Sequence, residues 1–174
     1  MNLIDTHCHL ADKRLGNNID QVIATAAAAG VNTMISAAAN LPDARIAADI
    51  AARHAEVYCT AGVHPHHAAE QSEDYLAEIE QLAAHERNVA IGEIGLDYHY
   101  DYSPRPRQKE AFAEQLALAA RLGKVIVIHT REAFDDTMAI IRESGVDGSK
   151  VVFHSFTGGA GGDGDTGGAG GAGG

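Results

Sequence analysis

The chain has 174 residues, of which 45% are hydrophobic, and its 24 acidic and 13 basic side chains give a formal net charge of −11. This length suits one domain, and the globular composition excludes a coiled coil, a collagen and a wholly disordered chain. The acidic balance excludes a general electrostatic attraction to nucleic acid or anionic lipid, so binding of phosphates would need a local feature.

Three features of the sequence bear on where the protein resides. The densest apolar run covers residues 125–128 and is far shorter than the roughly 20 residues that a membrane span needs. Residues 1–5 lack the basic start and the long apolar stretch of a secretion signal. Two cysteines, Cys8 and Cys59, are too few for a disulfide framework. We therefore expect a cytoplasmic protein that does not enter a membrane.

Glycine divides the chain into two unequal parts. Residues 1–157 hold eight of the nineteen glycines, and residues 158–174 hold the other eleven, together with alanine, two aspartates and a threonine. The second part has no side chain large enough to offset the entropy of ordering it, so we expect a disordered low-complexity tail. In the alternative, Asp163 and Asp165 supply ligands, but mobile ligands make a poorly organised site.

In residues 1–157, β-type and helical patterns alternate along the chain. The predicted elements, in chain order, are strand 3–6, helix 19–29, strand 33–36, helix 42–54, strand 57–63, helix 75–86, strand 89–94, helix 104–122, strand 125–129, helix 133–144 and strand 151–156. Six strands joined by five helices predict an α/β fold with a parallel sheet and right-handed crossovers.

Local signals support the predicted helix ends. Gly30, Gly123 and Gly145 each follow the end of a helical pattern, where a left-handed residue commonly stops a helix. Ser103 and Pro104 are typical of an N-cap followed by proline in the first helical position.

Ionisable side chains gather where the predicted strands end. Because carboxyl ends of parallel strands converge, side chains there can form one site. One such histidine is usually only a polar residue at the rim, but five histidines and a glutamate within an apolar strand indicate a metal site. The candidates are His7 and His9 on one side of the first strand, His64, Glu93, His129 and His154.

These ligands suit hydrolysis assisted by metal ions. Glu93 could bridge two divalent ions, with His7 and His9 on one ion and His129 and His154 on the other. The many imidazoles favour zinc, manganese or cobalt over magnesium. Such ions acidify a bound water and polarise an ester, an amide or a phosphoryl group.

Other charged residues are open to two interpretations. Arg131 shares the side of His129 if the strand continues that far, and would then contact a phosphate; the alternative is a solvated arginine. Three cations in one helical turn, at positions 105, 107 and 109, could hold an anion, but surface charges are commonplace. The histidines at 54 and 85 need only the helix dipole as explanation. Those at 66, 67 and 99 are expected in loops, where both a solvated and a functional role stay open.

Five motifs resemble those of the TatD family, in the family's order. They are Asp-Thr-His-Cys-His-Leu at 5–10, Gly-Val-His-Pro-His at 62–66, Ile-Gly-Glu-Ile-Gly-Leu-Asp-Tyr at 91–98, His-Thr-Arg at 129–131 and His-Ser-Phe-Thr-Gly at 154–158. The segment 106–116 also resembles the part of the family that follows the glutamate motif.

The resemblance implies a metal-dependent deoxyribonuclease on an amidohydrolase-like TIM barrel, of the 3′–5′ exonuclease or DNA-repair type. It implies that His7 and His9 bind one divalent ion, that Glu93 bridges to the second, and that His129 and His154 bind that second ion. Two divalent ions, of zinc, manganese, magnesium or cobalt, would be the cofactors. Glu93 would be the catalytic residue. His64 lies in a family motif near the site, and with Arg131 it is the candidate substrate contact.

The family pattern continues past the last motif, through two more strands and an aspartate that binds metal. A complete barrel has eight strands in about 250 residues, whereas six strands are predicted here. We therefore expect an incomplete, C-terminally truncated barrel over 1–157, whose first and sixth strands are exposed edges, and a metal site without that aspartate.

Two alternatives to a deoxyribonuclease remain. Histidine–carboxylate sites on barrels also hydrolyse amides, lactones and small phosphate esters. The missing aspartate and the glycine tail also fit a fragment without catalytic activity. If DNA is the partner, its binding should be weak and sensitive to salt because the net charge is −11.

Overall fold

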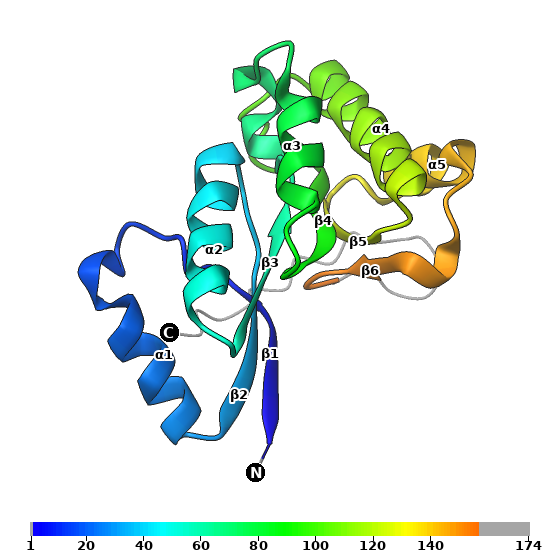
Figure 1. The fold of residues 1–174 in the computed structure, drawn as a ribbon. Helices are drawn as coiled ribbons and strands as arrows, with labels where there is room; N and C mark the ends of the chain where they lie inside the picture. Colours follow the sequence, from blue (N-terminus) through cyan, green and yellow to red (C-terminus); the bar gives the residue numbers. More distant parts are fainter. Residues whose placement is uncertain (1, 157–174) are drawn as a thin grey trace.

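A computed structural model describes residues 2–156 of the chain (Figure 1). The prediction of six parallel strands joined by five helices is confirmed. The elements in chain order are β1 (Leu3–Cys8), α1 (Ile19–Ala28), β2 (Val31–Ser36), α2 (Leu41–Arg53), β3 (Val57–Ala61), α3 (Tyr75–Ala83), β4 (Asn88–Asp97), α4 (Arg105–Leu122), β5 (Val125–Arg131), α5 (Phe134–Ser144) and β6 (Val151–Phe153). Three short 3₁₀ helices accompany them, η1 (Gly16–Asn18), η2 (Pro65–Glu70) and η3 (Gly148–Lys150).

The glycine-rich segment lies outside the described residues, and so do Asp163 and Asp165. The predicted domain boundary at residue 157 therefore stays a prediction.

The strands follow one another in chain order across a single curved sheet. Every neighbouring pair is parallel, and the helices lie along the convex side of the sheet, as Figure 1 shows. This is the strand–helix arrangement of a TIM barrel, with six strands forming an open part of it. The expected incomplete α/β barrel is thus confirmed.

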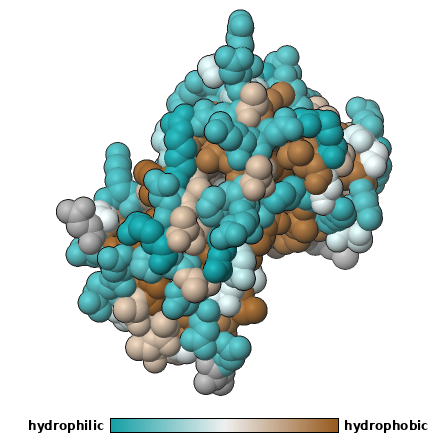
Figure 2. Space-filling model, viewed as in Figure 1, coloured by the Kyte–Doolittle hydropathy of each residue, from teal (hydrophilic) through white to brown (hydrophobic). Residues whose placement is uncertain are grey.

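The sheet has two exposed edges, as predicted. Within residues 2–156, β1 pairs only with β2 and β6 only with β5. On these edge strands Leu3, Ile4 and Val152 are 42%, 60% and 50% exposed. Figure 2 shows hydrophobic surface where the outline of the molecule is hollowed between these two ends of the sheet.

The hydrophobic core lies between the sheet and its helices and forms two clusters. One contains Ile91 and Ile94 of β4, Ile128 of β5 and Phe112 and Leu116 of α4, all at most 1% exposed. The other joins α1 and α2 to β2 and β3 and includes Ile23, Met34, Ile50, Val57 and Cys59. Burial of each large side chain stabilises the fold by roughly 1.5–3 kcal/mol. Within residues 2–156, no helix has the length and apolarity needed to cross a membrane.

The predicted helix ends are largely confirmed, with one error. Gly123 and Gly145 end α4 and α5 in the left-handed conformation, with φ of 65° and 67°. Ser103 is not the N-cap of α4, because the helix begins at Arg105 after Pro104. The Ser103 hydroxyl instead donates to the carbonyl of His66 and accepts from the amide of Ala69, and so ties this loop to η2.

Candidate metal centre

The sheet gathers histidines and two carboxylates at the carboxyl ends of its strands. His7 is in β1, Glu93 and Asp97 are in β4 and His129 is in β5. The other histidines of the centre follow strand ends: His9 comes directly after β1, His64 precedes η2 and His154 follows β6.

Glu93 is at the middle of this cluster and is only 4% exposed. Its Oε2 lies 3.3 Å from Nε2 of His7, and its Oε1 lies 3.2 Å from Nδ1 of His129 and 3.9 Å from Nε2 of His64. Burial alone would raise the pKa of this carboxyl, but the adjacent imidazoles of His129, His7 and His64 outweigh burial and hold the pKa well below its usual range. Glu93 is therefore an anion surrounded by imidazoles.

Two groups of side chains bring their ligand atoms within 4.8 Å of one another, and Glu93 belongs to both. The first group is His7, His9 and Glu93, and the second is His64, Glu93 and His129. A carboxylate has two oxygens, so this arrangement suits a bridge between two cations.

In the first group, each histidine keeps one ring nitrogen available for a metal ion. Nδ1 of His9 lies 3.1 Å from the carbonyl oxygen of Ala37, which leaves Nε2 of His9 free to bind a cation. Nε2 of His7 is buried and makes no hydrogen bond within residues 2–156. Cys8, between the two histidines, points to the other side and donates its thiol to the carbonyl of Ile35. A divalent cation would satisfy the orphaned nitrogen of His7.

His64 is also buried beside Glu93. It is 8% exposed, and burial lowers its pKa to about 3, so its imidazole is neutral. Its Nδ1 accepts a hydrogen bond from the amide of His66, and its Nε2 faces Glu93. A neutral imidazole in this position can bind a metal ion or contact a substrate.

His154 lies against His7, with the two rings stacked at 3.4 Å between centroids and 8° between planes. Burial lowers the pKa of His154, and the nearby His7 lowers it further, so a neutral imidazole is favoured. The sequence analysis assigns His154 and His129 to the same metal ion. In the structure, the ligand group that contains His129 includes His64 instead. The pairing of His129 with His154 stays a prediction.

The sequence analysis missed Asp97 and the role of His66. Asp97 is fully buried, and its Oδ2 lies 2.9 Å from Nε2 of His66 and 3.0 Å from Nε2 of His129. Burial would raise its pKa, but hydrogen bonds from the amide of Tyr100 and from both imidazoles lower it to about 2. Glu93 and Asp97 are four residues apart in one strand and share a face, which is the signal that could have found Asp97.

Close packing of the strands places these side chains. The β4–β5 register shifts between Ile91 and Ile94, so the strand is irregular where Glu93 lies. Gly95 pairs with His129, has a φ of 138°, and leaves only 2.0 Å between an added Cβ and the carbonyl oxygen of His129. Only glycine fits between these two parts of the centre.

The predicted phosphate contacts differ in their surroundings. β5 continues to Arg131, whose guanidinium lies 4.8 Å from the centre of the Tyr100 ring. The three cations at the start of α4 pair with carboxylates: Arg105 with Asp101 at 2.9 Å, Arg107 with Glu110 at 2.8 Å and Lys109 with Asp136 at 2.7 Å. Their charges are therefore largely neutralised, which favours the surface interpretation of this turn.

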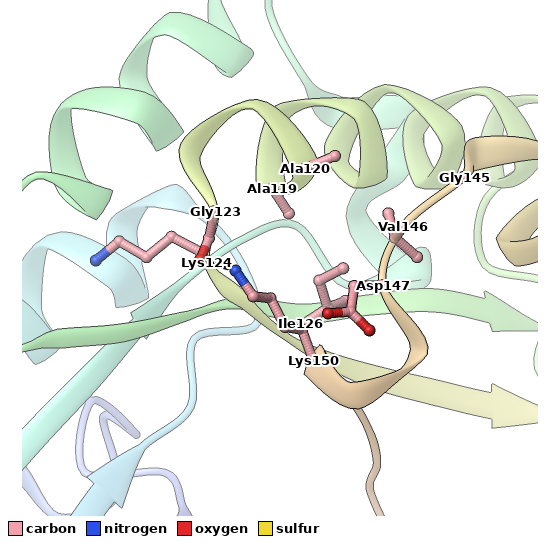
Figure 3. A pocket seen from close by; sticks show the side chains of 9 residues that line it. All are labelled: Ala119, Ala120, Gly123, Lys124, Ile126, Gly145, Val146, Asp147 and Lys150. Atoms are coloured by element: carbon pink, nitrogen blue, oxygen red, sulfur yellow. Dashed lines mark hydrogen bonds between the residues drawn. The ribbon is translucent and has the colours of Figure 1, made fainter.

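A separate pocket lies at the amino-terminal end of β5, away from the histidines (Figure 3). Two lysines line it, and both ammonium groups donate to backbone carbonyls: Lys150 to Gly123 and Lys124 to Asn88. These contacts connect loops at this end of the sheet, so they explain the lysines without a ligand.

Comparisons with known proteins identify relatives of the chain. The sequence profile of the family described as TatD related DNase matches residues 4–161. An uncharacterised metal-dependent hydrolase of Bacillus subtilis, YabD, is 39% identical over 158 residues, which are 91% of this chain and 62% of the relative. The 3′-5′ ssDNA/RNA exonuclease TatD of Klebsiella pneumoniae is 36% identical over 156 residues, which are 90% of this chain and 59% of the relative. The chain thus spans less than two thirds of these relatives.

Solved structures show the same fold. The TatD homologue YJJV of Escherichia coli superimposes with a TM-score of 0.76 at 28% identity, over 82% of this chain and 56% of the other. A TatD family hydrolase of Entamoeba histolytica gives a TM-score of 0.77 at 27% identity, over 83% of this chain and 55% of the other.

Proposed function

The chain belongs to the TatD family, and on this basis we propose that it hydrolyses phosphodiester bonds of DNA at a centre of two divalent metal ions. One observation carries the proposal: Glu93 is shared by two groups of potential metal ligands. A carboxylate between two ions is what a phosphoryl-transfer site needs to hold both.

The donor set fits divalent ions. Imidazoles and one carboxylate suit zinc, manganese or cobalt better than magnesium. The buried Nε2 atom of His7, which makes no hydrogen bond within residues 2–156, supports a cation at that position. We propose His7, His9 and Glu93 as ligands of one ion, and Glu93, His129 and His154 as ligands of the other. Bound there, the ions would acidify a water molecule and polarise the phosphoryl group.

The remaining side chains would orient these ligands and the substrate. Asp97 accepts from Nε2 of His129, so Nδ1 of that ring faces Glu93. Arg131 would contact a phosphate of the DNA, since arginine forks suit phosphate oxygens. His64 would stay neutral beside Glu93 and contact the substrate.

The direction of cleavage is taken from named relatives. The Klebsiella pneumoniae and Edwardsiella piscicida relatives are named 3′-5′ ssDNA/RNA exonucleases. We propose the same polarity on single-stranded DNA here.

Digestion of end-labelled single-stranded DNA tests the proposal. With manganese or zinc, we expect stepwise shortening from the 3′ end, which EDTA stops. Glu93→Gln should reduce the rate by about 100-fold or more, because the shared carboxylate would lose its charge. The matched control is His54→Ala, since His54 pairs with Asp20 away from the centre.

A panel of amide, lactone and small phosphate-ester substrates separates the nuclease from other hydrolases of this type. Cleavage of these substrates alone would contradict the deoxyribonuclease proposal. A folded protein that binds the metals but hydrolyses no substrate of either class would contradict catalysis altogether.

The ligand assignment has its own test, the metal content of His64→Ala and of His154→Ala. Loss of metal in His154→Ala supports the proposed set. Loss in His64→Ala alone would give His64 the ligand role instead.

A further inference from the structure

Two tyrosines in the loop between β4 and α4 have no evident role in the fold. Tyr100 is 45% exposed and Tyr102 is 67% exposed. Their rings stack on each other, with 5.3 Å between centroids and 16° between planes. Stacked aromatic rings at the surface leave hydrophobic area in water, so their position calls for a partner.

The other tyrosines of this region show the contrast. The hydroxyl of Tyr75 donates to Glu114, and that of Tyr98 donates to Asp136 at 2.6 Å. The hydroxyls of Tyr100 and Tyr102 make no hydrogen bond to any residue in 2–156. No such bond ties Tyr100 or Tyr102 to the rest of residues 2–156, so the pair is open to a ligand.

The tyrosine pair borders the metal centre. The ring of His66 meets both tyrosines edge-on, at 5.5 Å from Tyr100 and 4.8 Å from Tyr102. The same His66 contacts Asp97, which contacts His129 of the centre. A chain of direct contacts thus connects the exposed rings to the groups around Glu93.

A positive charge lies over the ring of Tyr100. The guanidinium of Arg131 is 4.8 Å from the centre of Tyr100, and Arg131 forms no ion pair with any carboxylate of residues 2–156. Arg105, in the same region, is instead neutralised by Asp101. A planar stacking surface next to an unpaired cation matches a base and its phosphate.

We propose that Tyr100 and Tyr102 form a stacking surface for a nucleobase of single-stranded nucleic acid, with Arg131 beside it for the backbone phosphate. The inference rests on the proposed function and adds the surface that would hold a base of the single strand. Bases of a duplex already stack on each other and would have to be extruded first. With a net charge of −11, the protein repels the backbone, so stacking has to supply much of the affinity.

The test measures binding, not turnover. The probes are a fluorescein-labelled oligothymidylate and an abasic oligomer of equal length, and anisotropy is read in EDTA. We expect the oligothymidylate to bind more tightly. Tyr102→Ala should weaken its binding about fivefold or more, which is the effect of removing one stacked ring, and Tyr100→Ala should act in the same direction. Neither substitution should change binding of the abasic oligomer by as much.

Ring-retaining and distant variants serve as controls. Tyr100→Phe and Tyr102→Phe should bind oligothymidylate like the wild type. Tyr58→Ala is the distant control. Tyr58 also has an arginine over its ring, since Arg87 lies 5.1 Å from the ring centre. This arginine–tyrosine pair is at the start of β3, far from the metal centre. Circular dichroism checks that each variant is folded.

Three outcomes would overturn the inference. They are equal binding of both oligomers by the wild type, equal losses on both oligomers in the alanine variants, and the absence of binding to either oligomer. Since binding is read without metal, failure of the proposed phosphodiester hydrolysis would not imitate any of them.

Discussion

Oδ2 of Asp97 lies 3.0 Å from Nε2 of His129, across the ring from Glu93. A carboxylate that accepts from one nitrogen of a metal-binding histidine fixes which nitrogen is free to bind. Asp97 therefore orients His129 towards Glu93 without itself belonging to either ligand group.

The first prediction concerns this pair. Asp97→Asn should weaken binding of the ion at His129 by about 10- to 100-fold, the usual cost of losing such a partner. Titration of the metal-free protein with manganese or zinc measures it. Unchanged affinity in a folded Asp97→Asn protein would show that Asp97 does not orient the ligand. The matched control is Asp136→Asn, since Asp136 is an exposed partner of Lys109.

A second prediction follows from the sharing of Glu93. His9→Ala should lower the metal content at one position only, and His129→Ala at the other. Glu93→Gln should lower it at both positions, because both ligand groups contain Glu93. Metal analysis of the purified folded protein measures the ions per chain. A Glu93→Gln protein that loses no more metal than His9→Ala would rule out the bridge.

The order and type of the elements could be predicted because the strands are short apolar runs and the helices carry clear stop signals. Gly123 and Gly145 end helices as predicted. Ser103 was misassigned because a serine before proline looks like a cap, whereas its hydroxyl bonds to η2, which is distant in sequence. Such a long-range partner leaves no local pattern.

The candidate centre could be predicted in outline for a related reason. Parallel strands must converge at their carboxyl ends, which brings the strands of His7, Glu93 and His129 together. The sequence could not show that His64 would lie beside Glu93, because the turn after β3 sets the position of His64. Nor could it show that Asp97 would accept hydrogen bonds from two imidazoles.

A third prediction tests the close packing beneath the centre. Gly95→Ala should destabilise the protein by more than about 2 kcal/mol, because the new Cβ would overlap the His129 carbonyl at a φ that disfavours alanine. Urea unfolding measures the free energy change. Gly148→Ala is the control, because an added Cβ there meets no atom within 4 Å. Equal stability of the two variants would contradict the packing argument.

A fourth prediction concerns a buried amide that holds the segment before His64. The side chain of Gln115 accepts from the amide of Val63 at 2.7 Å and donates to its carbonyl at 3.1 Å. Gln115→Leu would leave both backbone groups without a partner, so we expect a loss of about 2 kcal/mol or more in the free energy of unfolding. In the control, Gln21→Leu, only an exposed contact with Thr25 is lost. Similar unfolding midpoints for both variants would show that the buried bonds contribute little.

The last prediction concerns the salt dependence of DNA binding. Because Arg131 is proposed to contact a backbone phosphate and displace its counterions, binding of oligothymidylate should weaken with added salt. The slope of log affinity against log salt should fall by about 0.7 in magnitude in Arg131→Ala, the change for one phosphate contact on a single strand. Arg87→Ala, at the opposite end of the strands, should leave the slope unchanged. Tight binding that ignores salt would mean that phosphate contacts contribute nothing, and an unchanged slope in Arg131→Ala would remove Arg131 from the DNA contact.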